Sequence, residues 1–189
     1  MNSTLQLIIP QPTGTCSGVK NALELLPRLR ERYPEVRIFA NHQPVHHREA
    51  DRQLEAHRIS MLDPDNPNVL QAGDVVVGSA HGTPLPEITE VRLRGADFLD
   101  TVCPLVGSNF NWVSMPSETF VVYIGKPGHR EYEATASRAR KENCLLADVH
   151  QRNVDAVAVA IRESGLHKVA FVRQTTIPGN DPDIVRLHT

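Results

Sequence analysis

Long apolar runs and an excess of positive charge are both missing from this sequence. No hydrophobic segment approaches the roughly 18–20 residues that a membrane-spanning helix needs. The first residues, MNSTLQLIIPQPTG, lack the basic segment and long apolar core of a signal peptide. The formal net charge is −2 and the 20 Lys and Arg residues are scattered, which argues against binding to nucleic acid or an anionic membrane. We therefore expect a cytoplasmic protein.

Cysteine is scarce as well, and the pattern of the three cysteines argues against a disulfide framework. Thiols stay reduced in the cytoplasm, where cysteines in loops are better candidates for metal binding or redox chemistry. The CxxC spacing of structural zinc sites is absent. Turn-forming residues flank Cys16 and Cys103, which favours such a role for both. Cys144 begins a predicted strand and is expected to be a small structural residue.

The remaining composition is that of a globular protein with an α/β fold. Of the 189 residues, 40% are hydrophobic and 22% charged, enough for a genuine core in one domain or two small ones. Short apolar runs alternate with amphipathic segments, which favours parallel βαβ units with helices on both faces of each sheet. Strands are predicted over 5–10, 36–40, 59–62, 74–80, 96–101, 120–125, 144–149 and 168–174, and helices over 17–33, 47–57, 85–95, 130–142 and 154–165. Pro27 should kink or break the first helix, and the segment 103–119 is the natural boundary between two halves.

Six loops that follow predicted strands hold most of the chemically reactive residues. They read PTGTCSG, NHQPVHH, HGTP, VCPLVG, KPGHREYE and TTIPGND. Three of them bring histidine, two bring cysteine, one brings glutamate and one brings paired threonines. Because the carboxyl ends of parallel strands line the functional edge of an open sheet, this regular placement predicts one shared site.

The residues alone leave several chemistries open for that site. Five histidines gather in these loops, and together they suit either an anionic ligand such as a diphosphate or a metal: His42, His46, His47, His81 and His129. Glu131 is either an ordinary acidic residue in the first turn of a helix or a proton donor with a tuned pKa. Thr175 and Thr176 form either a cap or a hydroxyl pair that orients a substrate.

In order along the chain, these loops resemble those of the 4-hydroxy-3-methylbut-2-enyl diphosphate reductase family. The matching stretches are GTCSGV (14–19), NHQPVHH (41–47), GSAHG (78–82), DTVCPLV (100–106), GHREYEAT (128–135) and RQTTIPGND (173–181). The resemblance implies tandem small α/β domains with parallel sheets, two of the three lobes of a trefoil reductase fold. It also implies a cytoplasmic iron–sulfur enzyme of the non-mevalonate pathway of isoprene biosynthesis.

The same resemblance implies a role for seven residues. Cys16 and Cys103 match two ligands of a 4Fe-4S or 3Fe-4S cluster. His46, His81 and His129 match the histidines around the substrate diphosphate. Glu131 matches the acid that relays protons, His129 is grouped with it in catalysis, and Thr175 matches the hydroxyl that positions the substrate alcohol. The implied reaction is reductive dehydroxylation of an allylic diphosphate to isopentenyl and dimethylallyl diphosphate, with electrons from a ferredoxin or flavodoxin.

The chain departs from the family pattern at its end and near the site. It stops soon after QTT, where the family continues into a third unit, so we expect domains at 1–102 and 103–189 and no third family domain. Near the site, Thr15, His47, Arg130 and Ala134 stand where the family usually has an aromatic residue, Asn, Pro and Gly.

These departures leave open a fragment of a longer enzyme, a short paralogue with a cluster at a homodimer interface, and a cluster-free protein that binds a small diphosphate. Outside the family, the alternative is a His/Glu metal-dependent enzyme acting on a phosphorylated small molecule.

Overall fold

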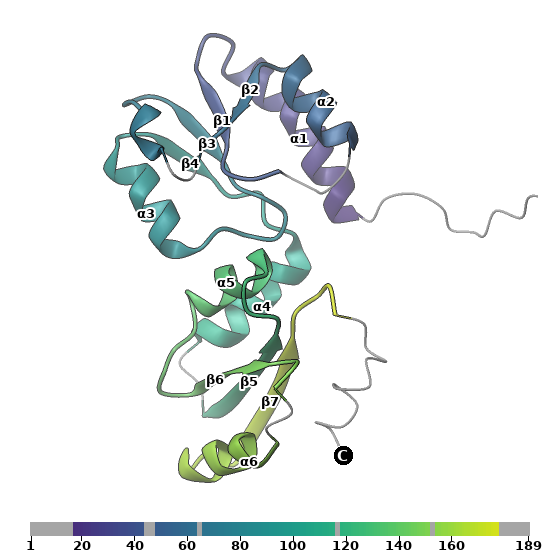
Figure 1. Cartoon of the computed structure of the whole chain (residues 1–189), viewed down its shortest axis with the longest axis vertical. Coiled ribbons are helices and arrows are strands. Elements are labelled where there is room, and N and C mark those ends of the chain that lie inside the picture. Colours follow the sequence, from purple (N-terminus) through teal and green to yellow (C-terminus); the bar gives the residue numbers. More distant parts are fainter. Residues whose placement is uncertain (1–16, 44–47, 64–65, 116–117, 152–153, 178–189) are drawn as a thin grey trace, which may run out of the picture.

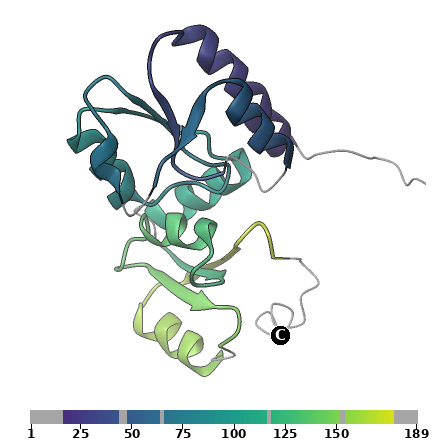
Figure 2. The ribbon, with the colours of Figure 1, turned by 45° about the horizontal axis from the view of Figure 1, so that its top comes forward.

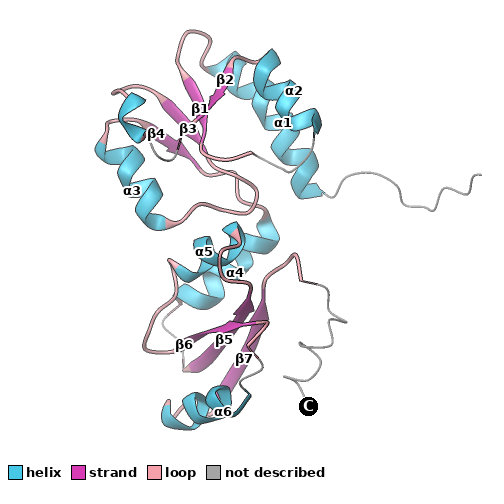
Figure 3. Cartoon of the chain, viewed as in Figure 1, coloured by secondary structure: helices cyan, strands magenta, loops and turns pink. Residues whose placement is uncertain are grey.

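Two parallel sheets, one in each half of the chain, form the framework of the structure (Figures 1 and 3). This computed structural model describes residues 17–43, 48–63, 66–115, 118–151 and 154–177. The expected strand 5–10, Cys16, and the loop residues His46 and His47 lie outside the described residues. Helices and strands alternate along the described chain, and the strand pairs are parallel, as the sequence predicts.

The first unit is a four-stranded sheet in the order β2-β1-β3-β4 with helices on both faces. Its elements are α1 (Ser17–Arg32), β1 (Ile38–Ala40), α2 (Arg48–Ala56), β2 (Ile59–Met61), the 3-10 helix η1 (Pro67–Val69), β3 (Val75–Val77), α3 (Leu85–Leu93) and β4 (Asp97–Leu99). Leu26 of α1 and Leu54 of α2 pack on one face of the sheet, and Val91 of α3 packs on the other. Covered on both faces, β3 is a run of three valines that are 0–1% exposed.

The second unit is a three-stranded sheet in the order β6-β5-β7. Its elements are α4 (Pro104–Ser114), β5 (Thr119–Gly125), α5 (Arg130–Ala136), β6 (Cys144–Asp148), α6 (Val154–Glu163) and β7 (Lys168–Arg173). Val113 of α4 and Tyr132 of α5 pack on one face of this sheet, and Val157 of α6 packs on the other. In both ribbon views α4 and α5 lie between the two sheets (Figures 1 and 2).

Helix α4 occupies the segment that the sequence marks only as a boundary. Pro104 begins the helix, where a missing N–H costs nothing, and Val106, Phe110 and Val113 follow at helical spacing and are buried. Gly107 weakens the local preference for a helix, so packing against α5 and the second sheet supplies the stability that propensity lacks.

Two helices differ from what the sequence predicts. The expectation that Pro27 would kink or break the first helix is wrong for the break, because α1 continues through Pro27 while Ala22, Leu26 and Leu29 bury one face of it. Helix α5 ends at Ala136 rather than continuing to 142. Beyond it the chain turns so that the Arg140 N–H donates to the Val113 carbonyl oxygen at 3.0 Å, a tertiary bond that replaces further helical turns. Among the described residues, no helix combines the length and hydrophobicity needed to cross a membrane.

Candidate active site

Loops that leave the carboxyl ends of β1, β3, β4, β5 and β7 hold the described candidate residues, as predicted. The loop after β3 lies against the helices of the second unit, and Gly82 approaches them closely. Its φ is +85°, and a Cβ placed there would lie 2.5 Å from Phe110 Cζ and 3.2 Å from Ala134 Cβ. Any other residue would have a strained backbone here and would push the Phe110 ring aside, so glycine allows the His81 loop to lie close against α4 and α5.

Glu131 lies at the centre of the second unit's part of the site. The residue is 0% exposed, although a glutamate with its ordinary pKa is charged at neutral pH. Its Oε1 accepts a hydrogen bond from the Thr175 backbone N–H at 2.6 Å, and its Oε2 accepts one from Thr175 Oγ1 at 2.7 Å. Thr175 itself is exposed, so its hydroxyl links a buried acid to the surface.

Burial raises the pKa of the Glu131 carboxyl above its usual range, because a carboxylate loses hydration inside the protein. Hydrogen bonds from Thr175 oppose this rise without cancelling it. A buried carboxyl that keeps its proton at higher pH than usual is suited to act as a general acid.

Two of the predicted substrate-binding histidines, one from each unit, face each other. The rings of His81 and His129 are in a T-shaped arrangement, with centroids 5.5 Å apart. His129 is also the N-cap of α5, where its Nδ1 accepts a hydrogen bond from the Glu131 N–H at 3.1 Å. An accepting Nδ1 carries no proton, so the neutral ring presents its N–H at Nε2.

Cys103 stands at the junction of β4 and α4. Its backbone N–H donates to the Ala80 carbonyl oxygen at 3.0 Å, which ties it to the residue before His81. The partly exposed side chain packs near Ala22 of α1 and near Phe110 of α4. The thiol therefore lies where the first helix, the β3 loop and the second unit meet.

Gln174 and Asn109 support this arrangement, and sequence reasoning singled out neither. Gln174 is 2% exposed; its Nε2 donates to Thr176 Oγ1 at 2.6 Å and its Oε1 accepts from the Lys126 N–H at 2.9 Å. Asn109, in α4, donates to the Arg173 carbonyl oxygen at 2.9 Å, and its side-chain amide acts to lower the pKa of Glu131. Gln174 lies in the quoted RQTT stretch, but Asn109 could be found only by recognising α4 as a helix.

A surface hollow of about 320 Å³ adjoins His129. Lys126 and His150 line it together with Thr176 and the buried Gln174. Cationic and hydroxyl groups in one hollow are suited to an anionic ligand.

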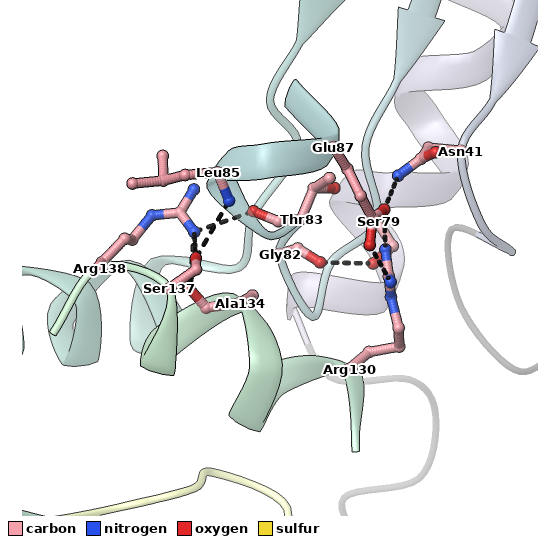
Figure 4. A network of polar contacts seen from close by, with 10 residues as sticks. All are labelled: Asn41, Ser79, Gly82, Thr83, Leu85, Glu87, Arg130, Ala134, Ser137 and Arg138. Carbon is pink, nitrogen blue, oxygen red and sulfur yellow. Dashed lines mark hydrogen bonds and ion pairs between the residues drawn. The ribbon is translucent and has the colours of Figure 1, made fainter. Parts of the chain in front are cut away.

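Polar contacts also join the two units directly (Figure 4). Arg130 donates to both carboxylate oxygens of Glu87 in α3, at 2.7 and 2.9 Å, and Asn41 donates to the same carboxylate at 2.8 Å. Arg138 donates to the Thr83 carbonyl oxygen at 2.9 Å, and Ser137 Oγ accepts from the Leu85 N–H at 3.1 Å. The amino end of α3 is thus bound to both ends of α5.

Of the two predicted cluster ligands, Cys103 is described and Cys16 precedes the first described residue of α1. Within the described ranges, His, Cys, Asp and Glu form no group of three or more that could hold a metal. Cys144 begins β6 opposite Val121, whereas the site loops leave the other end of the sheet, where Asp148 pairs with Gly125. This places Cys144 away from the site and in the apolar cluster of α4 and α5, as the sequence suggests for a structural cysteine.

Comparison with known proteins identifies the family. The family model described as LytB protein matches residues 7–186. The chain belongs to the LytB family. This confirms the resemblance inferred from the six loops, since the LytB relatives below carry the name of the same reductase.

Two curated LytB relatives are named 4-hydroxy-3-methylbut-2-enyl diphosphate reductase. The protein from Ehrlichia ruminantium (strain Welgevonden) is 26% identical over 188 residues, covering 98% of this chain and 55% of the relative. The protein from Tolumonas auensis is 30% identical over 178 residues, covering 92% and 54%. The chain therefore spans about half the length of the curated LytB relatives it matches.

Solved LytB reductase structures have the same fold over the aligned part. The E-1-hydroxy-2-methyl-but-2-enyl-4-diphosphate reductase from Plasmodium falciparum gives a TM-score of 0.75 at 24% identity, covering 94% of this chain and 54% of that one. A structure of (E)-4-hydroxy-3-methyl-but-2-enyl diphosphate reductase gives 0.73 at 22% identity, covering 96% and 63%. These matches confirm the predicted α/β class with tandem parallel sheets, as part of the trefoil reductase fold.

Proposed function

We propose that this chain carries the proton-donating and diphosphate-binding parts of a reductase that dehydroxylates an allylic diphosphate, 4-hydroxy-3-methylbut-2-enyl diphosphate in the first instance. The observation that carries the proposal is the buried Glu131 carboxyl, held through both oxygens by Thr175. The names of the LytB relatives supply the substrate class.

In this proposal the proton leaves Glu131 through the Thr175 hydroxyl. That hydroxyl contacts Glu131 Oε2 and belongs to an exposed residue, so it can pass a proton outward while it receives one from the acid. The C–O bond of the allylic alcohol breaks and its oxygen leaves as water. Two electrons and a second proton complete the conversion to isopentenyl or dimethylallyl diphosphate.

The histidines would bind the diphosphate. His81 and His129 come from different units and lie with their rings in contact, so an anion beside them would be held from both sides. The neutral His129 ring presents Nε2–H as a donor, and Lys126 lies in the adjoining hollow. His46 is proposed for the same role from the loop after β1.

Cys103 and Cys16 would be the ligands of the iron–sulfur cluster. The described thiol fits this role, because Cys103 is partly exposed and lies at the carboxyl end of β4, beside the helix that packs against α5. Such a cluster, when bound, supplies the electrons and an open iron for the alcohol oxygen. A ferredoxin or flavodoxin would reduce it, and a homodimer interface is one source of further ligands.

A conservative substitution of Glu131 tests the proton step. We expect Glu131→Gln to lower turnover of anaerobically reconstituted protein by roughly 10²–10⁴-fold. Binding of inorganic pyrophosphate, measured by calorimetry, should stay unchanged. Glu133→Gln is the matched control, because Glu133 lies on the same helix but accepts from the Gly128 N–H instead. Full turnover in Glu131→Gln would contradict the role, and a wild-type protein inactive on the diphosphate would contradict the reaction.

The cluster is tested by iron and sulfide analysis after anaerobic reconstitution. We expect Cys103→Ala to lose bound iron and Cys144→Ala to keep it. Measuring mass in solution with and without iron examines the homodimer, which should fall to monomer in Cys103→Ala. Iron-free wild-type protein after reconstitution would favour a diphosphate-binding protein without redox activity.

A further inference from the structure

We propose that Glu87 is a positioning residue that holds Asn41, the residue directly after β1, and the amino end of α5 in a fixed relation. This inference rests on the proposed function, because the candidate His42 follows Asn41 directly and the amino end of α5 holds the candidates His129 and Glu131. Glu87 itself belongs to neither segment: it lies in the first turn of α3.

The contacts of the Glu87 carboxylate link α3 to two other segments at once (Figure 4). Arg130 Nη1 donates to Oε1 at 2.7 Å and Nη2 donates to Oε2 at 2.9 Å, a bidentate pair that fixes orientation as well as distance. Asn41 Nδ2 donates to Oε2 at 2.8 Å. Asn41 is 7% exposed and its backbone N–H is bonded to the Val77 carbonyl oxygen, so that end of the link is anchored in the first sheet.

Arg130 connects this carboxylate to the site, because both of its neighbours in the sequence are site residues. It is the first residue of α5, directly between the N-cap His129 and the buried Glu131. Since Glu131 N–H donates to His129 Nδ1, a rotation of this turn would move both side chains together. The Arg130–Glu87 pair is half-buried, with side chains 24% and 38% exposed, so water competes with it only in part.

Ionised Glu87 is the form that these contacts require. Burial works to raise the pKa of Glu87, but hydrogen bonds from Arg130 and Asn41 and the charge of Arg130 outweigh it and hold the pKa below its usual value. The carboxylate therefore stays charged at neutral pH, although it adds negative charge near histidines proposed to bind an anion.

Because Glu87 is negatively charged, the positioning role and simple electrostatics predict opposite changes in pyrophosphate affinity when the charge is removed. Glu87→Gln removes a negative charge, so electrostatics alone would strengthen pyrophosphate binding. The positioning role predicts the opposite: the bidentate pair is lost, His81 and His129 are no longer held in their relative positions, and pyrophosphate affinity falls about tenfold. Arg130→Lys keeps the charge but loses the fork, and should weaken binding as well. Unchanged or tighter binding in Glu87→Gln would overturn the proposal.

Glu90→Gln is the matched control. Glu90 lies on the same helix and pairs with Arg94 at 2.6 Å, but neither residue contacts the other unit in the interactions described. We expect this variant to bind pyrophosphate as the wild type does. An equal loss of binding in Glu90→Gln would assign the effect to α3 stability rather than to positioning.

Hydrogen exchange separates this inference from the proposed function. Glu87→Gln should speed exchange in peptides that contain Asn41 and in peptides that contain His129–Glu133, whereas Glu90→Gln should do neither. If wild-type protein fails to bind pyrophosphate, the proposed anion site fails, and the exchange result still decides the positioning role. Exchange that rises in only one of the two segments, or in neither, would overturn it.

Discussion

Burial raises the pKa of both Glu131 and Cys144 in the second unit, and the consequences differ. Burial destabilises the Glu131 carboxylate, but hydrogen-bond donors from Thr175 reach both of its oxygens and offset part of that cost. Cys144 lies in an apolar cluster, with a weak contact to the Leu145 carbonyl oxygen. The first residue is equipped to exchange a proton, and the second to keep one.

The raised pKa of Glu131 makes stability depend on pH. Between the ordinary pKa of glutamate and the folded value, the folded protein binds more protons than the unfolded chain, so the free energy of unfolding falls as pH rises through that window. Below the window both states are protonated and the full stability remains. We expect Glu131→Gln to remove this fall, because the amide does not titrate and can still accept from the Thr175 N–H while donating to its hydroxyl.

Urea unfolding at a series of pH values from about 4 to 8 measures this difference. Glu133→Gln serves as control and should keep the pH dependence of the wild type. Parallel stability curves for wild type and Glu131→Gln would contradict the raised pKa.

Cys144 should resist alkylation in the folded protein. Burial raises the pKa of its thiol to about 11, so roughly 0.1% is thiolate at pH 8. Mass spectrometry after a timed exposure to iodoacetamide should find Cys144 unmodified, and modified once urea unfolds the chain. Rapid labelling of native Cys144 would contradict the raised pKa of its thiol.

At the scale of the elements, the sequence could predict what local patterns determine, but not what depends on contacts between distant residues. The sequence alone predicts the all-valine strand β3 and the helix α6, because the apolar residues that become buried, such as Val157, follow the local pattern of each element. Helix α4 and the end of α5 depend on contacts with distant residues, such as Arg140 with Val113. In the site, the strand-end placement was predictable, whereas the pairing of Glu131 with Thr175 joins residues 44 apart in the chain and needed the fold.

The turn at Gly82 sets how closely the β3 loop approaches α4 and α5. We expect Gly82→Ala to destabilise the protein by about 1–2 kcal/mol for the positive φ and about 1–3 kcal/mol more for the clash with Phe110. Gly73→Ala is the control for φ alone, because Gly73 has φ +89° and nothing lies within 4 Å of the added Cβ. Equal losses of unfolding free energy in the two variants would mean that the close approach costs nothing.

At the scale of the whole molecule, Arg138 joins the units by two kinds of contact. Its guanidinium donates to the carbonyl oxygens of Thr83 and Ala134, at 2.9 and 2.7 Å, and lies 4.0 Å from the centroid of the Phe110 ring. One side chain therefore spans the β3 loop, α4 and α5, and its removal should weaken the cooperation between the two sheets.

We expect Arg138→Ala to lower the free energy of unfolding by about 1–3 kcal/mol. Fluorescence of Trp112, the single tryptophan, reports the second unit, and circular dichroism reports both. The two transitions should coincide in the wild type and separate in Arg138→Ala. Arg140→Ala, which removes an exposed ion pair 3.8 Å long, should change neither, and coincident transitions in Arg138→Ala would contradict the coupling.

The position of Cys103 has one more consequence. The strand before it belongs to the first sheet, while the helix that starts after it packs with α5 on the second. A rotation of one unit against the other would therefore turn about residues 100–103 and change the distance between this thiol and the first helix. Any ligand held by Cys103 together with the first helix would restrict that rotation, so occupancy of the site should be readable as protection of the 100–103 segment from proteases.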